Sequence, residues 1–248
     1  VALCSPLNPT GTVFSRKQLE DICDLVLEEN ARRGPDQKPV YLMYDQIYWM
    51  LTFGNTEHVD PVSLRPAMKD YTVFVDGISK SLAATGVRVG WSFGPAKVIK
   101  NMRAILGHIG AWAPKAEQVA TANFMNNSAN FERFIGQMKQ KVSNRLFSLH
   151  EGIQAMHKDG LPIQSIQPEG AIYLSVKFTI MGKQTPKGQT IQTTNDIFSY
   201  MLENAGFAVV PFTAFGNDPG TEWFRVSVGT CKEEDIPGLL ANMRKALG

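Results

Sequence analysis

Apolar side chains recur every three or four residues in several stretches of the chain, and the first of these begins just after Ser15. Ser15 and Gln18 match a capping box, in which each side chain binds the backbone amide of the other residue. The apolar positions that follow are Leu19, Ile22, Cys23, Val26 and Leu27. Residues 30–38 are polar and contain Gly-Pro, so we expect this helix to give way to a loop there.

Helical spacing returns several times farther along the chain. Prolines at 95 and 114 suit the first turn of helices that we expect over residues 95–106 and 114–124. The longest pattern covers residues 130–158, and a helix of that length often joins two domains. Shorter helices are expected near residues 197–204 and after Glu233.

Short continuous apolar runs alternate with the first helices. They cover residues 40–43, 71–75 and 87–93, and such runs are typical of strands buried on both faces. Strands that alternate with helices indicate an α/β domain with a mostly parallel sheet. After Gly160 the pattern changes to short strands at 171–176, 207–210 and 223–228, which indicates a smaller α+β domain.

These patterns predict two domains joined by the long helix. The first covers residues 1–140 and holds part of a mostly parallel sheet, and the second covers residues 141–248. The chain begins Val-Ala-Leu-Cys-Ser-Pro, which resembles the end of a buried strand. We therefore expect the sequence to be part of a longer protein.

Composition narrows the classes of function. The 25 Lys and Arg residues against 23 Asp and Glu leave a net charge of +2, which argues against a nucleic-acid-binding surface. No apolar run approaches the ~18 residues of a membrane span, and no signal peptide is visible. The three scattered cysteines suit a reducing compartment, so we expect a cytoplasmic protein.

Several common functional motifs are absent from the sequence. It contains no G-x-G-x-x-G after a strand, no P-loop, no H-E-x-x-H and no C-x-x-C. Its four histidines show no metal-ligand spacing, so we expect no metal site. A nicotinamide-dependent dehydrogenase is the weakest of the enzyme hypotheses, because its glycine motif is missing.

Three polar groups follow predicted strands, where open α/β sheets bind ligands. Asn8 begins Asn-Pro-Thr-Gly, which alone is more typical of a plain turn. Asp45 and Tyr48 follow the strand at 40–43. A carboxylate there needs a cationic partner, although it could also cap a helix.

The third group lies in residues 77–91, where Ser79 and Lys80 follow a strand and Arg88 stands between Gly86 and Gly90. A lysine in this place can act as a nucleophile, and the glycines would let the backbone approach a bound group. An ordinary basic surface loop is the competing interpretation.

Taken together, these segments resemble the class I/II aminotransferases of fold-type I, which depend on pyridoxal phosphate. The segment GISKSLAATGVRVGW resembles the family's cofactor-lysine motif, and SPLNPTG and YDQIY precede it in the family's order. Residues 211–216 (PFTAFG) and 224–228 (FRVSV) resemble its small-domain segments. The resemblance extends from Ser5 to the C-terminus.

The resemblance implies a role for each of several residues. Lys80 would hold pyridoxal phosphate as a Schiff base and then move the substrate's Cα proton. Asp45 would pair with the pyridinium nitrogen, so that the ring acts as an electron sink. Tyr48 and Asn8 would bind the ring's 3′ oxygen.

The remaining roles concern the phosphate and the substrate. Arg88 would bind the phosphate, and Arg225 would bind the substrate carboxylate. Asn8 is a second candidate for substrate binding. Where the family often has a phosphate-binding serine, this sequence has Gly77, so Ser79 is the candidate donor in its place.

The implied activity is transfer of an amino group from an α-amino acid to a 2-oxo acid, with aspartate as the default substrate. Two alternatives stay open: a pyridoxal-phosphate C–S lyase on the same fold, and a non-catalytic ligand-binding domain of aminotransferase type. The family's phosphate-binding turn and part of its dimer interface lie in a first half that these residues do not include. We expect a homodimer for the full-length protein and little activity from residues 1–248 alone.

Overall fold

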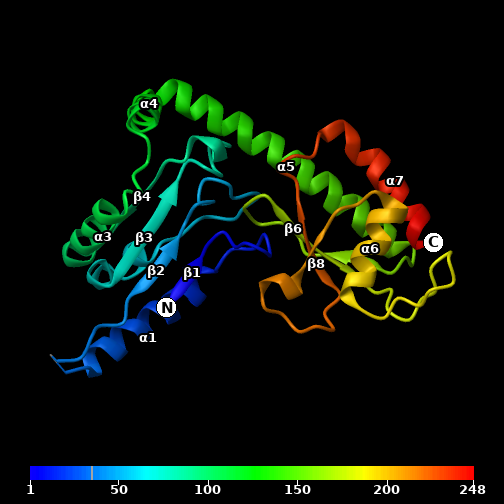
Figure 1. Cartoon of the computed structure of the whole chain (residues 1–248), viewed down its shortest axis with the longest axis horizontal. Coiled ribbons are helices and arrows are strands. Elements are labelled where there is room, and N and C mark those ends of the chain that lie inside the picture. The colour runs from blue at the N-terminus through cyan, green and yellow to red at the C-terminus, as the bar shows by residue number, and fades with distance from the viewer. Residues whose placement is uncertain (35) are drawn as a thin grey trace. The chain divides into compact units, whose positions relative to one another are not determined.

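Helix α1 (Arg16–Arg32) begins at the predicted capping box. The Ser15 hydroxyl accepts a hydrogen bond from the Gln18 amide at 3.2 Å, and the Gln18 side chain accepts one from the Ser15 amide at 2.9 Å. The helix continues three residues into the predicted loop, because Glu29 in its last turn pairs with Arg32 and with the capping residue Arg33. This computed structural model describes residues 1–34 and 36–248 (Figure 1), so position 35 of that loop lies outside the described residues.

The first sheet contains β1 (Ala2–Cys4), β2 (Leu42–Asp45), β3 (Thr72–Gly77) and β4 (Gly90–Phe93), in that spatial order. The first three strands are parallel, and β4 is antiparallel to β3. The mostly parallel sheet is confirmed. Because β1, β2 and β3 point the same way, the loops that follow them leave from one edge, and β4 starts at that edge opposite Gly77.

One face of this sheet is well covered. Its apolar side chains pack with α1, with the short helix α2 (Pro61–Leu64) and with the 3₁₀ turn η1 (Pro66–Asp70). The buried members of this cluster are Leu19, Cys23, Val26, Leu42, Tyr44, Leu64, Met68 and Phe74. On the other face Met43 is 46% exposed, and on β4 Phe93 is 47% exposed. The prediction that these strands are buried on both faces is therefore wrong for β2 and β4.

Three long helices follow the first sheet: α3 (Ala96–Ile109), α4 (Lys115–Asn126) and α5 (Ser128–Lys158). No side chain of α3 or α4 is fully buried. The start of α5 packs through Phe131, Phe134 and Ile135 against a cluster around Ile78 and Leu82. Its later turns bury Val142, Leu146, Leu149, Ile153 and Met156.

The second sheet is entirely antiparallel in the part of the chain that the structure describes. It contains β5 (Ile163–Ser165), β6 (Tyr173–Phe178), β8 (Trp223–Ser227) and β7 (Val210–Pro211), in that order. Helices α6 (Thr194–Ala205) and α7 (Ile236–Leu247) accompany it. Short 3₁₀ turns η2 (Thr85–Val87), η3 (Phe212–Phe215) and η4 (Glu233–Asp235) complete the elements. The predicted α+β character of this part is confirmed.

The described residues divide into two compact units. One contains Val1–Leu7 and Val13–Met138, and the other contains Asn8–Thr12 and Lys139–Gly248. The predicted domain ranges, 1–140 and 141–248, stay a prediction. Among the described residues, no helix has both the length and the hydropathy that a membrane span requires.

Candidate functional site

Asp45 ends the strand β2 at the edge where the parallel strands finish. Its backbone carbonyl accepts from Ser5 N at 3.0 Å, and the next amide, Gln46 N, donates to Val75 O at 3.0 Å. The half-buried carboxylate accepts from Ile47 N at 3.1 Å across a turn, so it does not cap a helix. It makes no ion pair within the described residues, which leaves a carboxylate available for a cationic ligand.

Tyr48 lies in the turn that follows Asp45 and is 2% exposed. The turn is closed by backbone hydrogen bonds from Trp49 N to Gln46 O at 2.8 Å and from Leu51 N to Tyr48 O at 2.7 Å. Asp45 and Tyr48 are therefore held by one short, hydrogen-bonded segment.

Lys80 lies in the loop between β3 and β4, at the same edge of the sheet. The loop is compact, because both Leu82 N and Ala84 N donate to Ile78 O at 3.3 Å and Thr85 Oγ1 donates to Ser79 O at 2.8 Å. Ser79 and Lys80 are half-buried. The Lys80 side chain forms no ion pair in the described part of the chain, so its amine is available to react.

Arg88 follows in the same loop, in the left-handed backbone region at φ 61°. Its Nη1 donates to Thr85 O at 2.9 Å. The side chain is exposed and lines a cavity of about 370 Å³ together with Asp76, Gly90 and Arg103. Arg88 forms no ion pair within the described residues, so its guanidinium at this cavity can bind an anion such as a phosphate.

Two glycines, Gly77 and Gly90, let the strands β3 and β4 come close together. A Cβ on Gly77 would lie 2.8 Å from Val89 O and 2.9 Å from Gly90 Cα, and a Cβ on Gly90 would lie 3.0 Å from Asp76 O. Gly77 and Gly90 face each other across β3 and β4, so both are needed for the strands to approach. Nothing lies within 4 Å of a Cβ on Gly86. That Gly86 and Gly90 make room for a bound group stays a prediction.

Sequence reasoning missed Asp76 and Ser81, which flank Lys80. Asp76 is 7% exposed and binds the Trp49 indole at 3.0 Å, and Ser81 Oγ donates to Ile47 O at 2.9 Å. Burial raises the pKa of the Asp76 carboxyl above its usual range, and the nearby Asp45 carboxylate adds to that rise. A charged residue in the run YTVFVDG was a usable signal, because the argument applied to Asp45 applies equally to Asp76.

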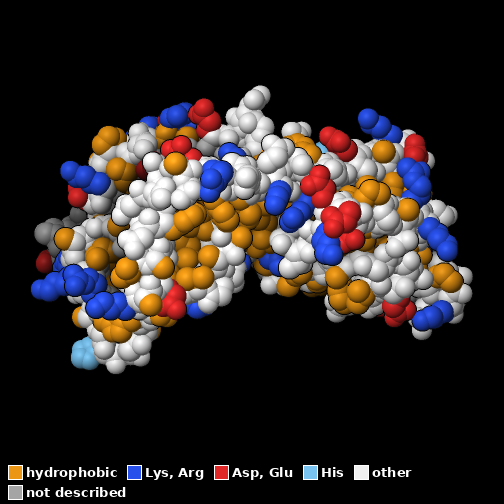
Figure 2. Space-filling model, turned by 90° about the horizontal axis from the view of Figure 1, so that it is seen from above, with side chains coloured by type: hydrophobic (Ala, Val, Ile, Leu, Met, Phe, Trp, Pro, Cys, Tyr) orange, Lys and Arg blue, Asp and Glu red, His pale blue; other side chains and the backbone are white. Residues whose placement is uncertain are grey.

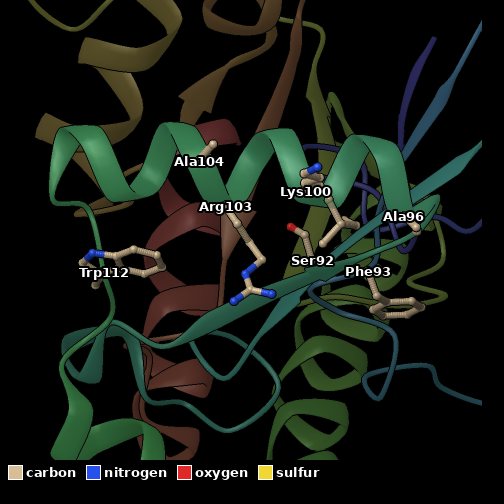
Figure 3. A pocket seen from close by; sticks show the side chains of 9 residues that line it. Ser92, Phe93, Ala96, Lys100, Arg103, Ala104 and Trp112 are labelled. Atoms are coloured by element: carbon tan, nitrogen blue, oxygen red, sulfur yellow. The ribbon is translucent and has the colours of Figure 1, made fainter.

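A second cavity in the first unit, of about 590 Å³, lies between β4 and α3. Figure 3 shows Arg103 projecting from α3 toward β4, with Trp112 at one end of the cavity and Phe93 at the other. Its basic side chains, Lys100 and Arg103, form no ion pair within the described residues. None of the residues predicted for the site lines this cavity.

Arg225 and Asn8 form the candidate group of the second unit. Arg225 Nη1 donates to Asn8 Oδ1 at 2.7 Å. The guanidinium carbon lies 4.6 Å from the centre of the Tyr173 ring and 4.9 Å from that of Phe215. Arg225 makes no ion pair among the described residues, and its Nε is buried without a hydrogen-bond partner. This arrangement suits a carboxylate ligand, which binds a guanidinium through two oxygens.

The local backbone explains how residues so far apart in sequence meet. Gly170 N and Glu169 N both donate to Gly11 O, and Ser175 Oγ donates to Thr10 O at 2.8 Å. Gly11 has φ +72°, and a Cβ there would lie 2.1 Å from Tyr173 O. The segment Asn8–Thr12 therefore runs against β6, and Ser175 of β6 pairs in register with Arg225 of β8.

The structure thus brings the predicted residues together in two groups. Asp45, Tyr48, Ser79, Lys80 and Arg88 lie in two neighbouring loops of the first unit. Asn8 and Arg225 form a hydrogen-bonded pair in the second. What each residue binds stays a prediction.

Comparison with known proteins gives consistent matches. The family profile described as "Aminotransferase class I and II" matches residues 1–242. An aspartate aminotransferase of Rhizobium meliloti (strain 1021) is 32% identical over 235 residues, which are 94% of this chain and 53% of that protein. The chain therefore spans about half the length of the relatives it matches.

Solved structures agree. The crystal structure of the aspartate aminotransferase from Rhizobium meliloti superposes with a TM-score of 0.86 at 29% identity, covering 100% of this chain and 57% of that one. An aromatic aminotransferase from Pyrococcus horikoshii gives a TM-score of 0.83 at 26% identity, covering 99% and 58%.

Proposed function

Because the chain belongs to the class I and II aminotransferase family, we propose that the protein transfers an amino group from an α-amino acid to a 2-oxo acid. One observation carries the proposal. Two neighbouring loops carry the amine of Lys80, the carboxylate of Asp45 and the guanidinium of Arg88. None of these groups forms an ion pair within the described residues.

These residues fit pyridoxal phosphate. The Lys80 amine suits the aldehyde, Asp45 suits the protonated pyridine nitrogen, and Arg88 suits the phosphate. Ser79 and Tyr48 are proposed as further hydrogen-bonding groups, and Asn8 retains its amide Nδ2 as a donor while its Oδ1 accepts from Arg225. When bound, pyridoxal phosphate supplies the electron sink that makes the substrate's Cα–H acidic.

Each of the chain's own residues is proposed to have a separate role in the reaction. Lys80 would hold the cofactor through its amine and would move the proton at the substrate Cα. Asp45 would stabilise a positive charge on the cofactor's ring nitrogen. Arg225 orients the amino acid by its α-carboxylate, and stacking between Tyr173 and Phe215 fixes the plane of the guanidinium.

We propose a small or acidic amino acid as the donor, with aspartate first. This rests on the relatives, among them proteins named aspartate aminotransferase and probable aspartate/prephenate aminotransferase. The similarity to the aromatic aminotransferase of Pyrococcus horikoshii makes aromatic amino acids the next class of substrate to test.

We also propose a homodimer. Most of the exposed large apolar side chains belong to the first unit, and hydrophobic patches are visible on the left-hand part of Figure 2. Ile105, Ile109, Trp112 and Val119 lie on or between α3 and α4 and are each more than half exposed. Several large apolar side chains exposed on neighbouring elements support a protein partner. The three free cysteines support the cytoplasm as the compartment.

The test is an absorbance titration of the intact protein with pyridoxal phosphate, followed by a panel of amino acids. Two results support the proposal. The bound-cofactor band shifts when aspartate is added, and the 2-oxo acid product accumulates in proportion to the amino acid formed from the second oxo acid. Product formation without a second oxo acid would instead indicate a lyase. Absence of a cofactor band would refute the proposal.

A further inference from the structure

Asp76 is a buried carboxylate to which the proposed chemistry assigns no role. It lies near the end of β3, four residues before Lys80, and is 7% exposed. Its Oδ1 accepts from Gly77 N at 2.7 Å, and its Oδ2 accepts from Trp49 Nε1 at 3.0 Å. Gln46 Nε2 approaches the same Oδ2 at 3.5 Å. The carboxylate makes no ion pair within the described residues, so uncharged N–H groups are what stabilise its charge.

The two side-chain donors, Gln46 and Trp49, come from the two ends of one turn. Gln46 and Trp49 bracket the segment that carries Tyr48 and directly follows Asp45. On the other side of Lys80, Ser81 is 1% exposed and binds the same turn through Ile47 O. Two side chains, at positions −4 and +1 from Lys80, therefore hold the turn that follows β2 against the loop that follows β3.

We propose that Asp76 is a positioning residue, which through Trp49 fixes the Asp45–Tyr48 segment relative to the Lys80 loop. The inference rests on the proposed function, because a fixed spacing matters if Lys80 and Asp45 would both hold the same cofactor. A misplacement of about 1 Å in such a site can cost about a hundredfold in rate.

The geometry requires a carboxylate at position 76. Each of its oxygens faces an N–H donor, Gly77 N on one side and Trp49 Nε1 on the other. An asparagine presents one oxygen and one NH₂, so it leaves one donor facing another donor. Asp76→Asn should therefore disturb the turn while Trp49 is present, and should disturb it less in a Trp49→Phe background.

The first experiment needs no cofactor. In a ¹H–¹⁵N spectrum of the intact protein, the four tryptophans give separate indole signals. We expect Asp76→Ala to shift the Trp49 indole signal, to speed its hydrogen exchange about tenfold or more, and to leave the Trp112 signal in place. An unchanged Trp49 signal would show that the hydrogen bond does not exist and would overturn the proposal.

The second experiment measures cofactor binding and the pH dependence of the bound-cofactor absorbance. Asp76→Asn and Trp49→Phe should each weaken binding about ten- to a hundredfold and move the pH midpoint of the absorbance, and the double variant should be little worse than either one. Trp223→Phe, the same change on β8 in the second unit, is the control and should do neither. Additive effects, or an unmoved midpoint, would leave Asp76 a merely structural residue.

The two proposals fail in different ways. If the unmodified protein binds no pyridoxal phosphate, the proposed function is wrong, and the indole signal alone then reports whether Asp76 holds the turn. If the protein binds the cofactor and the variants match the control, the positioning role is wrong and the proposed function stands.

Discussion

Replacement of Arg225 by lysine keeps the positive charge and removes the planar fork. In the structure, Nη1 of the guanidinium donates to Asn8, and the guanidinium carbon lies over the Tyr173 and Phe215 rings. An ammonium group can neither bind a carboxylate through two parallel hydrogen bonds nor stack in this way. Arg225→Lys is therefore a test of geometry at constant charge.

The expected magnitude follows from the bonds lost. A charge-assisted hydrogen bond contributes about 1.5–3 kcal/mol, and lysine loses one of two to the substrate carboxylate. We expect kcat/KM to fall about ten- to a hundredfold for Arg225→Lys. Arg225→Ala loses both bonds, about 3–6 kcal/mol, so we expect a fall of about two to four orders of magnitude.

The assay is steady-state transamination with the bound-cofactor absorbance recorded in parallel. Arg244→Lys is the matched control, because Arg244 lies in the same unit and pairs with Asp159 at the surface, where such pairs contribute little. The cofactor band should be the same in all the proteins. Normal kcat/KM in Arg225→Lys, or a lost cofactor band, would refute the assigned role.

Three further predictions concern the first unit. Gly77→Ser introduces the serine that the resemblance implies at this position. It should lower the free energy of unfolding by about 1–3 kcal/mol in denaturant titrations, because its Cβ would collide with Val89 O; unchanged stability would contradict this. Both ring nitrogens of His58 are buried without hydrogen-bond partners, and burial lowers the pKa of this histidine in the folded state. The neutral ring is therefore compatible with the fold above about pH 6.5, and the free energy of unfolding should decrease as the pH falls through the folded-state pKa. His58→Phe should reduce that loss between pH 7.5 and 5.5, and an equal loss in both proteins would count against it. Burial raises the pKa of the Cys23 thiol to about 11, so maleimide should label Cys23 only on unfolding; rapid labelling of the folded protein would disagree.

The sequence predicts the elements of this fold well where the periodicity is long. The capping box at Ser15 and the pattern over residues 130–158 gave helices α1 and α5 to within a few residues. Strand burial was predicted less well, because an apolar run such as residues 40–43 shows that a face can be buried, and only the structure shows that Met43 is 46% exposed.

Part of the candidate site could also be predicted from the sequence, and part of it could not. Local order in the sequence indicates that polar residues follow β2 and β3, and parallel strands place them at one edge. The contact between Arg225 and Asn8 joins residues more than two hundred positions apart, so no local pattern could indicate it. The reason for Gly77 was also hidden, because it depends on the distance between two strand backbones.

Covalent trapping of the cofactor tests the central claim most directly. The intact protein is mixed with pyridoxal phosphate, reduced with borohydride, digested and analysed by mass spectrometry, with a Lys80→Ala variant treated alongside. We predict a stable cofactor adduct on the peptide that contains Lys80, and its loss in the variant. An adduct on another lysine at equal yield, or none at all, would contradict the assignment of this loop as the reactive centre.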